Sequence, residues 1–399
     1  MSSVIRLGVV GGARGKGFGH SLGSLKGRMK LSAICDLHPG VRAAWQKDFP
    51  DIHSFEDYET MLDSGKVDAV LLATPMPLHV PQSIAALRRG IHVASEVTAC
   101  ITIDEGRRLI RAVEQSKATY FFAENYVYSR THRMIETMIR QGVFGEITYV
   151  QGGYYHDCRS LAFNQDGSLT WRGILRRDFN CHTYPTHTLG PIDRWLGVRE
   201  GKDRFVSVMA STSRQAALSD YAAQRFGKKS RYANPAAFKH GDTQKLLIKT
   251  ANGVLVDILF DPISPRPGNC AEHFITGTKA CFHSNTPIPY ADGMRAGPAI
   301  AFADKGKNGH YHWQPLMDMA DQYEHPQWRR HLATAEKSGH GGGDYFILLD
   351  FANAIQGRGK PAIDVYDAVL WSAFIELSDR SIRTGKTLPV PEFRPKGKR

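Results

Sequence analysis

The 399-residue chain lacks features that would place it in several classes of protein. No apolar run approaches the roughly 18–20 residues that cross a bilayer, so we expect no membrane partner. Its six cysteines form no CxxC pair and no histidine–carboxylate cluster has metal spacing, so we expect neither a disulfide framework nor a metal site. An apparent strand begins at Val4 with no signal peptide before it, so the expected location is cytoplasmic.

Charge of one sign is moderately in excess but is not concentrated. Lysine and arginine number 51 against 39 acidic residues, which gives a net charge of +12. The basic residues are mostly scattered and do not alternate with aromatic residues, so we expect no nucleic-acid partner. The hydrophobic share of 42% and the length fit a globular chain with two domains.

The first 125 residues alternate short apolar runs with helical segments. One helix is predicted over 102–115, where Thr102 and Glu105 have the spacing of a capping box. Alternation of this kind predicts a doubly wound parallel sheet, and therefore an α/β dinucleotide-binding Rossmann domain over 1–125. The predicted strands are 4–10, 30–35, 67–73, 91–94 and 119–123.

A glycine-rich turn follows the first predicted strand and suggests a phosphate site. Glycines let the backbone approach a pyrophosphate, and the following helix offers free N–H groups. Asp36 lies 25 residues after Gly11, near the spacing of the carboxylate that binds the adenosine ribose, so NAD is favoured over NADP. A glycine-rich turn of an unrelated α/β protein is the alternative. The turn contains Gly11, Gly12, Ala13, Arg14 and Gly15.

Three further segments resemble the Gfo/Idh/MocA family of sugar and inositol dehydrogenases. They are 73–75 with His79, 90–93 leading to Glu96, and 142–147. The resemblance implies that the Rossmann domain is followed, over 126–399, by an α/β domain with a large open, mostly antiparallel sheet. The exposed face of that sheet often meets a partner subunit in this family, so we expect a homo-oligomer.

The chain departs from the dehydrogenase branch at two positions. That branch has Glu-Lys-Pro where this chain has Glu96-Val97-Thr98, and valine cannot carry a proton. It also has an aspartate four residues before its catalytic histidine, where this chain has Thr183 before His187. These two departures count against an NAD-dependent sugar or cyclitol dehydrogenase with net hydride transfer, which stays an alternative. A non-catalytic sugar or nucleotide sensor is a third possible function.

The segment 184–191, which reads Tyr-Pro-Thr-His-Thr-Leu-Gly-Pro, resembles the signature of glycoside hydrolase family 109, the NAD-dependent glycosidases. The resemblance implies a carbohydrate substrate and a tightly held NAD. The sugar would be oxidised transiently at C3, deprotonated at C2 and cleaved by elimination, and water addition and re-reduction would follow. Other segments that resemble this family are 123–125, 154–157, 264–267, 339–344 and 364–367.

The same resemblance assigns site residues. Tyr184 and His187 are expected to transfer the C3 and C2 protons, from one helical face if a first turn forms after Thr183. Tyr154 and His156, two apart on a strand, are expected to complete the catalytic set. Glu124 either contacts the cofactor or caps the next helix, and His340 either binds the sugar or belongs to a glycine hinge. Expected cofactor contacts are Gly11, Gly12, Ala13, Arg14, Gly15, Asp36, Thr74, Pro75, His79, Glu96, Glu124 and Asn125, and expected substrate contacts are His340, Trp171 and Arg172.

The rest of the chain predicts mixed structure. Two strands over 242–250 and 253–260 flank the hairpin turn at 251–253. Residues 286–312 hold many prolines and glycines and are expected to form a loop or a partner arm. Helices are expected over 344–355 and 365–382 because apolar residues recur there at helical spacing.

Overall fold

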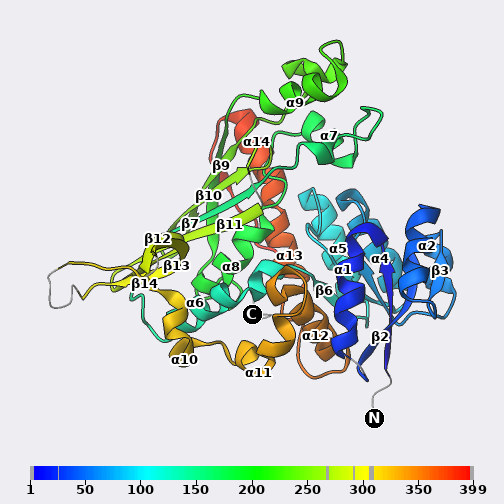
Figure 1. Cartoon of the computed structure of the whole chain (residues 1–399), viewed down its shortest axis with the longest axis horizontal. Coiled ribbons are helices and arrows are strands. Elements are labelled where there is room, and N and C mark those ends of the chain that lie inside the picture. Colours follow the sequence, from blue (N-terminus) through cyan, green and yellow to red (C-terminus); the bar gives the residue numbers. More distant parts are fainter. Residues whose placement is uncertain (1–3, 26, 267–268, 291–292, 305–309, 396–399) are drawn as a thin grey trace. The chain divides into compact units, whose positions relative to one another are not determined.

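A computed structural model of the chain describes residues 4–25, 27–266, 269–290, 293–304 and 310–395 (Figure 1). The chain forms two compact units. Unit 1 contains Met1–His132 and His325–Ala373, and unit 2 contains Arg133–Glu324 and Phe374–Arg399. The sequence predicts one boundary, at residue 125, whereas in the structure the late segment His325–Ala373 also belongs to unit 1.

Unit 1 is built on a six-stranded parallel sheet with the order β3-β2-β1-β4-β5-β6. This is the strand order of dinucleotide-binding folds, with the switch point between β1 and β4. The predicted Rossmann domain is therefore confirmed. Its strands are β1 (Ile5–Val10), β2 (Met29–Cys35), β3 (His53–Phe55), β4 (Ala69–Leu72), β5 (His92–Ser95) and β6 (Tyr120–Phe122). Its first helices are α1 (Gly12–Ser21), α2 (Pro39–Asp48), α3 (Tyr58–Asp63), α4 (His79–Arg88) and α5 (Ile103–Gln115).

Local sequence explains where these helices begin. The Thr102 hydroxyl accepts a hydrogen bond from the Glu105 amide at 3.2 Å, and the Glu105 carboxylate accepts one from the Thr102 amide at 3.1 Å. This is the predicted capping box, which satisfies two otherwise free donors at the start of α5. Leu109 and Ile110 on the same helix are buried.

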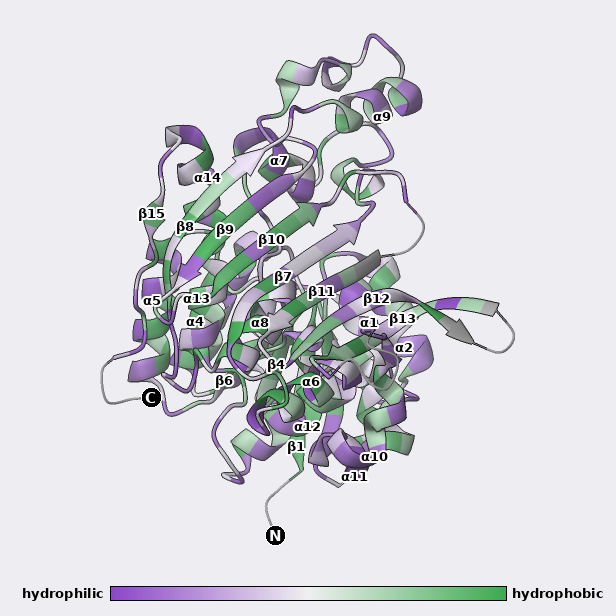
Figure 2. Cartoon of the chain, turned by 90° about the vertical axis from the view of Figure 1, so that its left-hand side faces the viewer, coloured by the Kyte–Doolittle hydropathy of each residue, from purple (hydrophilic) through white to green (hydrophobic). Residues whose placement is uncertain are grey.

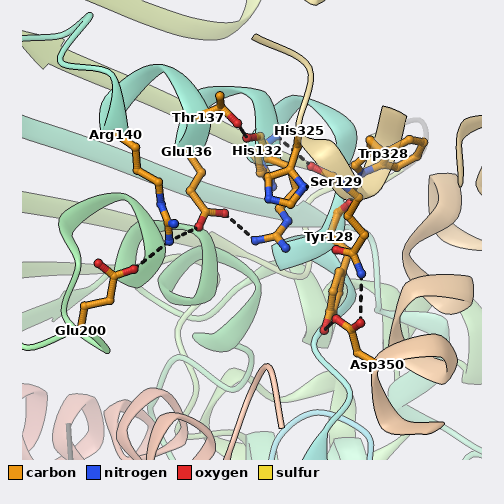
Figure 3. A network of polar contacts seen from close by, with 12 residues as sticks. Tyr128, Ser129, His132, Glu136, Thr137, Arg140, Glu200, His325, Trp328 and Asp350 are labelled. Atoms are coloured by element: carbon orange, nitrogen blue, oxygen red, sulfur yellow. Dashed lines mark hydrogen bonds and ion pairs between the residues drawn. The ribbon is translucent and has the colours of Figure 1, made fainter. Parts of the chain in front are cut away.

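The late segment of unit 1 packs against early elements of the same unit. It contains α11 (Pro326–Ala335), α12 (Gly343–Ile355) and α13 (Val365–Ser372). The Phe351 ring lies 5.8 Å from that of Phe121. The Tyr128 hydroxyl donates to Asp350 at 2.9 Å (Figure 3). These contacts join residues more than 200 positions apart, so unit 1 is complete only when the late segment is present.

Unit 2 is built on a nine-stranded sheet with the order β14-β13-β12-β11-β7-β10-β9-β8-β15 (Figure 2). Neighbours are antiparallel except for β7 and β10, so the predicted mostly antiparallel sheet is confirmed. The predicted hairpin is present as β9 and β10. The strands are β7 (Ile147–His156), β8 (Phe205–Thr212), β9 (Gln244–Thr250), β10 (Leu255–Asp261), β11 (Asn269–Gly277), β12 (Ala280–Tyr290), β13 (Gly293–Phe302), β14 (Gln314–Pro315) and β15 (Leu388–Pro389).

The expectation of a loop over 286–312 is wrong for its first part. Residues 286–290 belong to β12 and residues 293–302 form β13, its antiparallel partner. Prolines are tolerated here because β12 pairs with β11 only over Cys281–His283, so Pro287 faces one partner strand rather than two. Residues 291–292 and 305–309 lie outside the described residues.

Helices in unit 2 anchor the sheet and its connections. Helix α8 packs on β7 and β11, and α14 packs on β8. At the end of α6, Arg140 forms ion pairs with Glu136 at 2.8 Å and with Glu200 at 2.7 Å (Figure 3). The helices are α6 (Arg130–Arg140), α7 (Trp171–Asp178), α8 (Thr186–Leu196), α9 (Ala217–Phe226), α10 (Ala320–Tyr323) and α14 (Phe374–Thr384).

Candidate active site

The glycine turn of unit 1 lies at the carboxyl end of β1. Gly11 has a φ of +85°, and a Cβ there would lie 2.6 Å from the Ala73 carbonyl oxygen, so only glycine fits. Helix α1 begins directly afterwards at Gly12. The N–H groups of Ala13 and Arg14 have no acceptor earlier in this helix and can therefore bind a phosphate.

Gly15 has a second role, in packing. A Cβ at Gly15 would lie 2.3 Å from the Val9 side chain, so glycine lets α1 approach β1 closely. The Trp45 indole donates to the Gly12 carbonyl at 2.9 Å and fixes the start of α1 from the side of α2. The turn thus combines close helix–strand packing with free N–H groups, although its glycine spacing is irregular.

Asp36, at the end of β2, is held in one orientation by two backbone amides. Its Oδ2 accepts from the Gly12 amide at 2.7 Å, and its Oδ1 accepts from the His38 amide at 2.9 Å. The carboxylate therefore stands beside the glycine turn, where an adenosine ribose is bound in this fold. These residues fit NAD, which would place its pyrophosphate at the turn and its ribose hydroxyls at Asp36.

Arg14 is the charged side chain of the turn, and it contacts two carboxylates of unit 1. Its Nη2 lies 2.5 Å from Glu96 Oε1 and 3.8 Å from Asp344 Oδ1. Glu96 follows β5, whereas Asp344 belongs to the first turn of α12 in the late segment. The late segment thus supplies an acidic residue, Asp344, to the predicted cofactor site, and no motif in the sequence predicts this role.

The loops after β4 and β5 are tied together by His79. Its Nε2 lies 2.9 Å from the Thr74 carbonyl oxygen and its Nδ1 lies 2.7 Å from the Thr98 carbonyl oxygen. Burial lowers the pKa of His79, so the ring is neutral at pH 7. His79 therefore organises the loops that contain Thr74, Pro75 and Glu96, which makes it a positioning residue for the predicted cofactor site.

Glu124 and Asn125 follow β6 at the same sheet edge, and both are buried. The Glu124 carboxylate accepts a hydrogen bond from the Tyr126 amide at 3.0 Å, which caps the short helix over Asn125–Tyr128. The capping alternative is thus present in the structure. Contact of Glu124 or Asn125 with the cofactor stays a prediction.

His340 lies in unit 1, where it and Arg14 both contact the Asp344 carboxylate. Its Nδ1 lies 2.9 Å from Asp344 Oδ2, the same carboxylate that faces Arg14. His340 has a φ of +51°, an unusual value for a residue other than glycine, and Gly341 and Gly342 that follow also have positive φ. Both alternatives, a ligand-binding histidine and a glycine hinge, stay predictions.

Unit 2 brings together the four residues that were predicted to be catalytic. Tyr154 on β7 is the centre of the group, since its hydroxyl lies 3.0 Å from His156 Nδ1. Its ring centroid lies 4.8 Å from that of His187 and 6.3 Å from that of Tyr184. Four groups that can donate or accept protons therefore lie in one cluster, which we call the Tyr–His cluster.

The relation between Tyr184 and His187 differs from the prediction. Helix α8 begins at Thr186, after Pro185, so Tyr184 precedes the helix and the two residues do not share a helical face. Their rings are nevertheless stacked, with centroids 5.8 Å apart and planes inclined by 17°. Tyr184 and His187 are therefore close to each other, as predicted, but through stacking of their rings at the start of α8.

Two structural features hold the Tyr–His cluster in place. A Cβ at Gly152 would lie 3.0 Å from the Thr188 side chain, so glycine lets α8 lie close against β7. The irregular segment before Tyr184 is fixed to α14, because the His182 amide donates to the Ser378 hydroxyl at 3.0 Å and the Asn180 amide donates to Asp379 at 2.9 Å. Neither feature was evident in the sequence.

One histidine of the cluster and a buried histidine of the same unit have lowered pKa values. Burial and the neighbouring His187 and Arg172 lower the pKa of His156, so its ring can accept a proton at pH 7. His182 is fully buried and stacks on Phe260 with ring centroids 4.3 Å apart. Burial lowers the pKa of His182 well below its ordinary value, so we regard His182 as a neutral packing residue.

Helix α7 presents Trp171 and Arg172, the predicted substrate contacts, in unit 2. The Arg172 guanidinium lies 4.3 Å from the centroid of the Trp171 ring. Arg176, one turn later, is 4% exposed and donates from Nη1 to the Cys158 carbonyl at 3.1 Å. Arg176 was not predicted, although its spacing of four residues from Arg172 is a signal that a helical reading could have used.

The described part of the chain contains no group of three or more histidine, cysteine, aspartate or glutamate side chains that could hold a metal ion. No helix among the described residues is long and apolar enough to cross a membrane.

Comparison with known proteins identifies the family. The profile described as "Glycosyl hydrolase 109, C-terminal domain" matches residues 128–398, and that described as "Oxidoreductase family, NAD-binding Rossmann fold" matches residues 5–124. The chain belongs to glycosyl hydrolase family 109. The two matches together identify an NAD-dependent enzyme that acts on carbohydrates, and the expected family, cofactor and enzyme class are confirmed.

Relatives of family 109 match the chain over nearly its full length. A "Glycosyl hydrolase family 109 protein" of Solibacter usitatus is 31% identical, and the alignment covers 98% of this chain and 89% of that protein. An "Alpha-N-acetylgalactosaminidase" of Tannerella forsythia is 29% identical, with coverage of 98% and 86%. Both glycosidase relatives span the two units.

Solved structures with the same fold include dehydrogenases. Levoglucosan dehydrogenase in complex with NADH and L-sorbose has a TM-score of 0.76 at 18% identity and covers 98% of this chain and 100% of its own. Myo-inositol 2-dehydrogenase of Lactobacillus plantarum has a TM-score of 0.70 at 15% identity, with coverage of 98% and 100%. At these identities the likeness shows a shared fold.

Proposed function

We propose that this member of family 109 is a glycosidase that uses NAD without consuming it. The observation that carries the proposal is the Tyr–His cluster, in which two tyrosines and two histidines lie together on β7 and at the start of α8. Cleavage by elimination needs several proton transfers on one sugar, and a cluster of neighbouring proton carriers suits that demand. When bound, NAD⁺ supplies the acceptor for the hydride of C3 and returns it at the end of the cycle.

The chain's own residues would divide the proton transfers. Tyr184 takes the proton of the C3 hydroxyl, and His187 takes the C2 proton that becomes acidic beside a C3 ketone. His156 is neutral, because burial lowers its pKa, and its 3.0 Å contact with the Tyr154 hydroxyl orients that hydroxyl while Tyr154 keeps its proton. Tyr154 then assists the leaving group at C1 as an acid, and the same groups run in reverse when water adds.

Holding NAD throughout the cycle falls to unit 1. The turn after β1 offers the N–H groups of Ala13 and Arg14, and Asp36 offers a fixed acceptor for the ribose hydroxyls. Asp344 and Glu96 hold the Arg14 side chain at the same turn. This arrangement favours retention of the cofactor, as a cycle without net oxidation requires.

Net dehydrogenation is the second candidate, because His187 occupies the position of the histidine that dehydrogenases of this fold use. Against it, Val97 and Thr183 stand where that branch has its lysine and aspartate. A sugar dehydrogenase would accumulate NADH steadily, whereas the proposed glycosidase would release the aglycone with no net NADH.

The test follows p-nitrophenyl glycosides in heavy water. We expect release of p-nitrophenol, deuterium at C2 of the product and no net change in absorbance from NADH. Tyr184→Phe and His187→Ala should each lower kcat by about 10²- to 10⁴-fold while NAD stays bound, since each removes a positioned acid or base. Full activity in both variants, or steady NADH formation, would refute the assignment.

A further inference from the structure

Two arginines beside the Tyr–His cluster form no ion pair with any carboxylate that the structure describes. Arg172 and Arg176 lie four residues apart on one face of α7. Within the described residues, no carboxylate forms an ion pair with either guanidinium. Arg172 contacts the Trp171 ring and Arg176 contacts the Cys158 carbonyl, which lies two residues after His156.

The other arginines near the end of β7 are paired, which makes this pair distinct. Arg159 forms a two-pronged contact with Asp157 at 2.9 and 2.8 Å. Arg266 lies 3.3 Å from Asp261. Among the described residues, Asp157, Asp261 and Asp178 are therefore each paired with another arginine, and none of the three pairs with Arg172 or Arg176.

Leaving a buried guanidinium without a counter-charge costs free energy, because burial removes its water. Arg176 is 4% exposed, and burial lowers its pKa, with a further lowering from the charge of Arg172. The positive charges of Arg172 and Arg176 also lower the pKa of His156. Binding of an anion would lower this free energy, because the anion offsets the repulsion between the two arginines.

We propose that Arg172 and Arg176 form a site for an anionic substituent of the sugar, so that this enzyme acts on carboxylated or sulfated glycosides. The inference rests on the proposed function, because the elimination uses C1, C2 and C3 of the ring. Recognition is left to C4, C5 and C6, and a carboxylate or sulfate at C6 is the chemistry that suits two guanidinium groups. Trp171 beside Arg172 offers an apolar face to the same ring.

The test compares matched pairs of p-nitrophenyl glycosides in the gluco and galacto series and in both anomers. Each neutral hexoside is paired with its C6 carboxylate and with its 6-sulfate, and the two anionic arms show which anion is preferred. We expect one anionic arm to exceed its neutral partner in kcat/KM by at least about tenfold, which corresponds to about one charge-assisted hydrogen bond.

Variants tie the preference to α7. Arg176→Met and Arg172→Met should each reduce the anionic-to-neutral ratio of kcat/KM by about 10- to 100-fold, and Arg176→Lys should retain part of it. Arg177→Met is the matched control, because Arg177 is exposed on the same helix and is paired with Asp178 at 2.8 Å. It should leave the ratio unchanged. If Arg176→Met does not fold, Arg172→Met and Arg176→Lys still decide the result.

Calorimetry with D-glucuronate and D-galacturonate on the NAD-loaded protein separates the two proposals. Binding that is lost in Arg176→Met, without turnover of any glycoside, would support the anion site and refute the proposed glycosidase. Turnover with C2 exchange of neutral glycosides, at a ratio that the α7 variants do not change, would support the glycosidase and overturn the anion site.

Discussion

The orientation of Asp36 predicts how strongly the enzyme discriminates NAD from NADP. Both carboxylate oxygens are fixed by backbone amides, at 2.7 and 2.9 Å, so the group cannot rotate away from a 2′-phosphate. At about 5 Å and an effective dielectric constant of about 20, one pair of unit charges repels by about 3 kcal/mol. Solvent screening at this half-buried site reduces the penalty to about 2–3 kcal/mol, or roughly 30- to 150-fold in Kd.

Asp36→Asn tests this reasoning because it keeps the shape of the side chain and removes its charge. NADP should bind about 30- to 150-fold more tightly than to the parent protein, and NAD should bind about threefold to tenfold more weakly, since a neutral amide makes a weaker hydrogen bond to the ribose. Isothermal titration calorimetry with both dinucleotides at one ionic strength measures the ratio of the two Kd values.

Glu56→Gln provides the control for this experiment. Glu56 is an exposed carboxylate just after the neighbouring strand β3, and it pairs with Arg42 at 3.1 Å rather than with the glycine turn. Its substitution removes the same charge and should leave the preference for NAD unchanged. Two results would show that Asp36 does not set the selectivity. One is a ratio of the NADP and NAD Kd values that changes by less than about threefold in Asp36→Asn, and the other is a change in Glu56→Gln as large as that in Asp36→Asn.

Two further predictions concern stability and assembly. Burial lowers the pKa of His132 to about 4, so an unfolded chain takes up this proton first as the pH falls below about 6.5. Stability should therefore fall between pH 6.5 and 4, by about 3 kcal/mol from this group, and urea unfolding of His132→Gln should show a shallower fall; an identical pH profile would contradict this. Met209 and Leu247, paired across β8 and β9, are 48% and 41% exposed, and we expect the open sheet to self-associate through this face. Leu247→Lys should then reduce the mass measured by light scattering, and a monomeric parent protein at tens of micromolar would refute this.

Local patterns in the sequence predicted the elements that local physics decides. The apolar runs of unit 1 became β1, β2, β4, β5 and β6, and the Thr102–Glu105 spacing became a capping box. The strand β3 was missed because its three residues, two of them polar, carry no apolar run. The loop expected near Pro287 is a strand in the structure. A proline is tolerated in a strand where no neighbouring strand requires a hydrogen bond from its backbone nitrogen, and the sequence does not show which neighbours a strand has.

The site was predictable in part for the same reason. Short-range motifs located Tyr154, His156, Tyr184 and His187, and the structure brings these four together. Contacts between distant segments were not predictable from one sequence. Asp344 reaches Arg14 across 330 positions, and the lack of a carboxylate beside Arg176 depends on where every nearby acidic residue points.

The return of residues 325–373 to unit 1 has a consequence for biosynthesis. A ribosome that has made only the Rossmann strands has not yet supplied Phe351, Asp350 or Asp344, so the nascent unit lacks both part of its core and one carboxylate of its predicted cofactor site. Unit 1 can therefore close only after residues 325–373 have been translated. A fragment cut at the apparent end of the Rossmann domain would expose the apolar surface that these helices cover, and it should aggregate rather than bind dinucleotide.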